Sequence, residues 1–170
     1  MSGPAEPRGG APVAILTDLP PLQASAILYM RLWCSGPERQ AQMWNDFTCR
    51  FGATEARERL CAFESLLTLI TANARRPIMR HTLHCRCVGA DEAVWANLIA
   101  SAADGDEADA RLFAALLVRP AIAEAVAEQA RDVSRAICAC ARCGGATVRP
   151  VAEGAPPAPG IPDPSSPTRH

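Results

Sequence analysis

The chain has 170 residues, and its 17 Lys and Arg against 18 Asp and Glu leave a formal net charge of -1 at pH 7. This length fits one domain whose core can form without disulfides. The balanced charge excludes bulk electrostatic binding to nucleic acid or to an anionic membrane as the main function. No apolar run reaches the roughly 18 residues that a membrane-spanning helix needs.

Both ends of the chain are rich in proline and lack an apolar period, which predicts disordered tails over residues 1–16 and 146–170. Residues 17–145 between them are rich in alanine and poor in β-branched residues, which excludes strands and favours helices. We therefore expect an all-α fold, a single bundle of about six helices in one domain.

Each expected helix has an apolar stripe of helical period, and caps, prolines or glycines bound it. In chain order the six helices are expected at about residues 19–34, 37–51, 54–76, 91–104, 107–119 and 120–143. The last two meet at Val118-Arg119-Pro120, which contains neither glycine nor a polar turn residue. This pattern suits a kink in one bent rod better than a full hairpin.

The N-terminal segment lacks the basic flank and apolar stretch of a signal peptide, which predicts a cytoplasmic protein. Disulfides rarely persist in that compartment. The chain contains no lysine, which is typical of a GC-rich bacterial genome because arginine codons are GC-rich.

The chain has eight cysteines. Three of them, Cys34, Cys49 and Cys61, fall inside helical patterns, where free cysteine commonly acts as a small buried hydrophobe. The other five form two clusters, one after the third helix and one at the end of the sixth: Cys85 and Cys87, then Cys138, Cys140 and Cys143.

Thiolate and imidazole groups are the ligands of tetrahedral zinc, and two histidines lie beside the first cluster. The leading hypothesis is a structural zinc ion that pins the loop after the third helix to the end of the sixth. Its ligands would be Cys85, Cys87, Cys140 and Cys143, with His81, His84 and Cys138 as alternates.

This four-cysteine site requires the two clusters to meet. In a strict up-down bundle they lie at opposite ends, and they return to one end only if the fifth and sixth helices form one bent rod. A site made by His81, His84, Cys85 and Cys87 alone, an iron–sulfur cluster and the absence of any metal are the alternatives.

On this basis we expect a small interaction or regulatory module with a protein partner. The alternative function is a thiol redox switch that uses the same cysteines. A weaker alternative is an enzyme whose site is not visible in the sequence, since no nucleophile elbow or phosphate loop is present. The basic stretch at residues 75–86 is expected to be a solvated helix end rather than a nucleic-acid contact.

Overall fold

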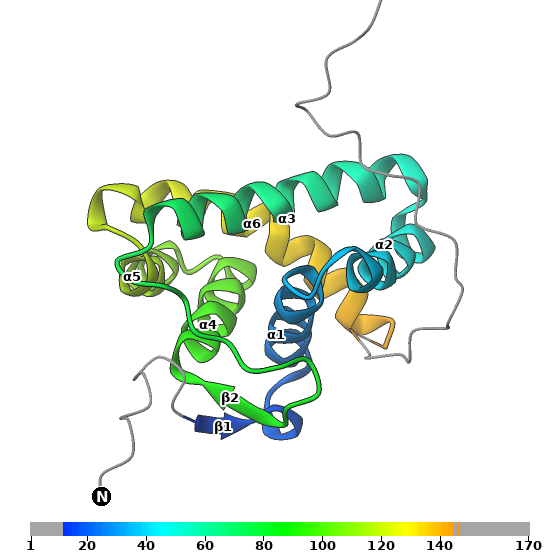
Figure 1. Ribbon diagram of the computed structural model, residues 1–170. Coiled ribbons are helices and arrows are strands. Elements are labelled where there is room, and N and C mark those ends of the chain that lie inside the picture. The colour runs from blue at the N-terminus through cyan, green and yellow to red at the C-terminus, as the bar shows by residue number, and fades with distance from the viewer. Residues whose placement is uncertain (1–11, 145, 147–170) are drawn as a thin grey trace, which may run out of the picture.

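The computed structural model describes residues 12–144 and residue 146. In this part of the chain six α-helices and one small antiparallel sheet form a single helical fold, as Figure 1 shows. The helices are α1 (Pro21–Trp33), α2 (Pro37–Phe51), α3 (Ala53–Asn73), α4 (Ala90–Asp104), α5 (Glu107–Leu117) and α6 (Pro120–Arg142). The predicted all-α class with six helices is confirmed.

Two short strands depart from the prediction. Strand β1 (Pro12–Ile15) pairs antiparallel with β2 (Cys87–Gly89), and a single 3-10 turn, η2 (Leu16–Asp18), leads from β1 toward α1. Residues 12–16 were expected to belong to a disordered tail. A strand of four residues is too short to show a period, and its partner lies far along the chain. The expected tails over residues 1–11 and 147–170 lie outside the described residues.

Local signals place the helix ends. Pro21 occupies the first turn of α1, where its missing N–H costs nothing. The Asp106 carboxylate caps α5 by accepting from the Asp109 N–H at 3.0 Å. Gly36 is the N-cap of α2, and the hydroxyl of the preceding Ser35 donates to the Arg31 carbonyl at 2.6 Å.

Helices α5 and α6 do not form one bent rod. Val118 between them is extended and fully buried, and its backbone pairs with Ala74 after α3. The Arg75 N–H donates to the Leu117 carbonyl and the Arg119 N–H to the Asn73 carbonyl, both at 3.2 Å. These long-range hydrogen bonds keep Val118 and Arg119 extended, so the chain changes direction between α5 and α6. They override the local preference for a kinked helix.

The core lies between α1, α3, α4 and α6 and includes side chains from every helix. Phe63 on α3 contacts Trp33 and Trp95 edge-on, with ring centroids 5.8 Å and 6.0 Å away. The Trp95 indole N–H donates to the Ala26 carbonyl of α1 at 2.9 Å, so this buried donor is satisfied. Within residues 12–144 no helix combines the length and the apolar character needed to cross a membrane.

Candidate functional site

The segment from Ala74 to Gly89 connects α3 to α4 across the face of α1, and we call it the 74–89 segment. A buried ion pair holds it in place. Arg31 on α1 donates to both carboxylate oxygens of Glu92 on α4, from Nε at 2.7 Å and from Nη2 at 2.9 Å. Both side chains have 0% exposure, so water neither screens nor solvates this pair.

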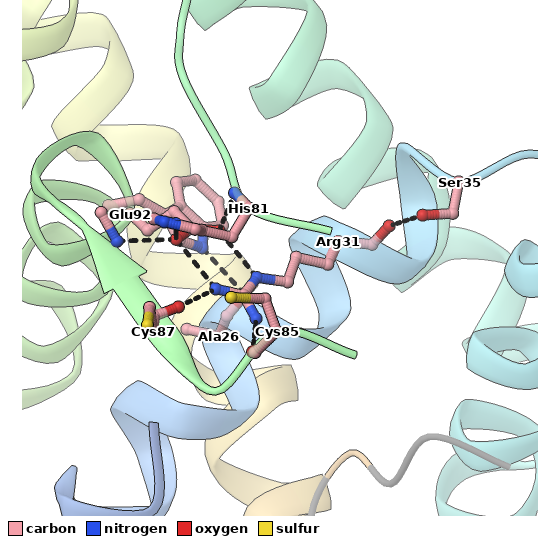
Figure 2. A network of polar contacts seen from close by, with 9 residues as sticks. Ala26, Arg31, Ser35, His81, Cys85, Cys87 and Glu92 are labelled. Atoms are coloured by element: carbon pink, nitrogen blue, oxygen red, sulfur yellow. Dashed lines mark hydrogen bonds and ion pairs between the residues drawn. The ribbon is translucent and has the colours of Figure 1, made fainter. Parts of the chain in front are cut away.

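Each partner also bonds to the backbone of the 74–89 segment, as Figure 2 shows. Arg31 donates to the carbonyls of Cys85 and Cys87, both at 2.7 Å. Glu92 Oε1 accepts from the His81 N–H at 3.1 Å. Glu92 Oε2 accepts from the Gly89 N–H at 2.8 Å and lies 3.0 Å from His81 Nδ1. The pair therefore satisfies backbone groups on both sides of the cysteines, and its own charges are fully hydrogen-bonded.

Glu92 is ionised in this setting. Burial raises the pKa of its carboxyl, but the hydrogen bonds from Arg31, Gly89 and His81 outweigh burial and leave the pKa below its usual value.

A second contact secures the same segment. Asp91 precedes Glu92 and pairs with both terminal nitrogens of Arg76 at 2.7 Å, and it accepts from the Met79 N–H at 2.8 Å. Both carboxylates in the first turn of α4 therefore hold the 74–89 segment. Arg76, expected to be solvated, is paired through this contact although half of its side chain is exposed.

Cys85 and Cys87 are separated by one residue on this segment. The neighbouring Cys85 thiol, and the charge it would carry as a thiolate, raise the pKa of the Cys87 thiol. Both cysteines are half-buried, whereas His84 between α3 and β2 is exposed. The structure thus brings together two of the four predicted zinc ligands.

The other two lie elsewhere. Cys140 on α6 is buried against the Tyr29 hydroxyl, and burial raises the pKa of its thiol to about 11. Tyr29 and Arg31 are two residues apart on α1, so their side chains project about 200° apart. Because Tyr29 contacts Cys140 while Arg31 bonds to Cys85, the two clusters lie on different sides of α1.

The remaining cysteines do not complete a site. Cys143 is exposed and Cys138 half-buried at the end of α6. Among the described residues, no group of three or more His, Cys, Asp or Glu side chains is arranged to hold a metal ion. The expectation that Cys34, Cys49 and Cys61 fill the core is wrong, because all three are exposed, Cys34 at the C-cap of α1 and the other two within α2 and α3.

Arg31 is not among the residues that the sequence singled out. The sequence feature that could have identified it is its position inside the apolar run of α1, between Met30 and Leu32. A charged residue at a core position of a helix needs a buried partner, so its position could have indicated an internal ion pair.

The fold and the site define a small all-α protein in which a buried ion pair holds a cysteine-containing loop. Comparisons with protein-family models, with curated proteins and with solved structures gave no match.

Proposed function

We propose that this protein is a thiol-responsive regulatory module, in which oxidation of Cys85 and Cys87 releases the 74–89 segment for contact with a protein partner. One observation carries the proposal. Cys85 and Cys87 are separated by a single residue, and their two carbonyls are the backbone acceptors of the buried Arg31 guanidinium.

The chemistry requires a hydroperoxide as oxidant. The raised pKa of the Cys87 thiol makes it the weaker nucleophile of the two, so we assign the attack on the peroxide to the thiolate form of Cys85. An S–O bond forms, the O–O bond breaks, and the leaving oxygen takes up the proton that the Cys85 thiol released, so that it departs as water or alcohol. The Cys87 sulfur then attacks the Cys85 sulfenic acid, an S–S bond forms, and the hydroxyl leaves as water with the Cys87 proton. Two thiols are oxidised and one peroxide is reduced.

The disulfide would change the backbone that the ion pair holds. Its sulfur atoms must approach to about 2.05 Å, and the ring closed across the single residue Arg86 contains the Cys85 carbonyl carbon and carries the Cys87 carbonyl on its Cα. If these carbonyls turn away from Arg31, a buried charged donor loses two partners, at about 1–3 kcal/mol each. The hold on the 74–89 segment then weakens, while the helical core beneath it is unchanged.

The test combines peroxide oxidation with peptide mapping and amide hydrogen exchange. We expect one equivalent of hydrogen peroxide to link Cys85 to Cys87 and to speed exchange of the His81 and Gly89 amides, which donate to Glu92. Cys85→Ser should abolish both effects. The matched control is Cys61→Ser, which removes an exposed, isolated thiol on α3. Protection of these amides that is unchanged in the linked protein would overturn the proposal.

A zinc ion is the second candidate, favoured by the position of two soft ligands, Cys85 and Cys87, two residues apart on one segment. With Cys140 and Cys143 as further ligands, the end of α6 would have to move around α1. Elemental analysis of the same samples, purified without an affinity metal, distinguishes the two functions. About one zinc per chain, with Cys85 and Cys87 protected from alkylation until a chelator is added, supports the metal site and argues against the switch.

A further inference from the structure

A separate pocket of about 410 Å³ lies between α1, α3 and the first residues of the 74–89 segment. Its wall is mostly apolar, made by Met30, Leu67, Ile70, Ile78, Trp95 and Leu117. The volume falls within the range of small-molecule sites, which combine apolar walls with a few polar groups that orient the ligand.

The rim of this pocket is positively charged. Arg76 and Arg80 both line it, but the charge of Arg76 is matched by Asp91. Arg80 donates to the Cys34 carbonyl at 3.0 Å, and it has no carboxylate partner among the described residues.

Cys34 beside Arg80 does not cancel this charge. Burial raises the pKa of the Cys34 thiol, and the nearby guanidinium only partly opposes this, so the thiol stays protonated at neutral pH. The pocket therefore combines an apolar interior with one unmatched positive charge at its opening.

We propose that this pocket binds a small amphipathic carboxylate, with an aliphatic body against Trp95 and Ile70 and its anionic head at Arg80. An alkyl body suits the apolar wall because each buried CH₂ group strengthens binding. A carboxylate suits Arg80 because the planar guanidinium fork matches its two oxygens. The inference does not depend on the redox chemistry of Cys85 and Cys87.

Isothermal titration calorimetry with straight-chain carboxylates below their micelle concentrations tests the proposal. From hexanoate to octanoate we expect the affinity to rise by up to roughly fourfold per CH₂ group. Decanol, which has the same chain as decanoate without the charge, should bind more weakly than decanoate. An affinity that does not change with chain length, or decanol binding as tightly as decanoate, would overturn the assignment.

Two pairs of variants locate the site. Arg80→Gln should weaken decanoate about three- to tenfold, a modest loss because the side chain is exposed. The neighbouring Arg75→Gln, outside the pocket, should have no effect. Thr71→Trp at the pocket edge should block binding, while Thr68→Trp, exposed on the same helix outside the pocket, should not. Equal binding by the Thr71 and Thr68 variants would show that decanoate binds elsewhere.

Discussion

Arg31 and Glu92 are two side chains that hold both each other and the 74–89 segment. Together they satisfy each other's charge and four backbone groups of the 74–89 segment, at Cys85, Cys87, His81 and Gly89. Replacing such a pair by apolar residues is often tolerated when only the two charges are lost. Here the same exchange would leave four backbone groups without partners, so we expect it to destabilise the fold.

The pH dependence of stability provides a test at this scale. The pKa of Glu92 is lower in the folded than in the unfolded protein, whose glutamates titrate near about 4.3. The ionised Glu92 therefore contributes its full share of the free energy of unfolding above the unfolded-state pKa. This share is lost as the pH falls through the folded-state pKa. We expect the free energy of unfolding, from urea titrations, to fall between pH 5 and pH 3.

Glu92→Gln should flatten this acid dependence, because the amide does not titrate in that range. At pH 7 it should cost about 3–5 kcal/mol, since Arg31 is left as a buried charge without its counter-charge. Glu55→Gln, on an exposed pair with Arg59, serves as the control and should cost less than about 1 kcal/mol. Equal acid dependence in wild type and Glu92→Gln would contradict the role given to Glu92.

At the scale of elements, α4 begins and ends for different reasons. At its start Asp91 and Glu92 bind the 74–89 segment, so the first turn is held by tertiary contacts. At its end Gly105 adopts the left-handed conformation, with φ of 78°, and its N–H donates to the Ser101 carbonyl. This helix end is therefore set by local backbone geometry alone.

Gly105→Ala isolates that local effect. No atom lies within 4 Å of the position that a Cβ would occupy, so the substitution causes no clash. We expect a loss of about 1–2 kcal/mol from the left-handed backbone alone, measured by thermal or urea unfolding. Ala103→Gly, at an exposed position within α4, is the comparison and should cost about 1 kcal/mol through helix propensity. A Gly105→Ala protein with the same free energy of unfolding as the wild type would mean that the turn can adopt another conformation.

At the scale of the whole molecule, all six helices of the described chain share one core. Phe63 lies at its centre, because it contacts both Trp33 at the end of α1 and Trp95 on α4. A core without internal boundaries should unfold as one cooperative unit.

Phe63→Ala tests this cooperativity. The fully buried ring should leave a cavity and cost about 3–5 kcal/mol. Tryptophan fluorescence and far-UV circular dichroism should report the same shifted urea midpoint. Two separate transitions, one for α2 and α3 and one for α4 to α6, would show that the core is divided.

The sequence by itself determined the six helices and most of their ends, because apolar period, prolines, glycines and the Asp106 cap act within a few residues. It also predicted a candidate site at residues 81–87. Only the tertiary structure decided which groups those residues contact. Arg31 and Glu92 are 61 positions apart, β1 pairs with β2 across more than 70 residues, and Cys85 and Cys140 lie on different sides of α1. Such contacts depend on how the helices pack, and no local pattern encodes which side of a central helix two distant clusters will occupy.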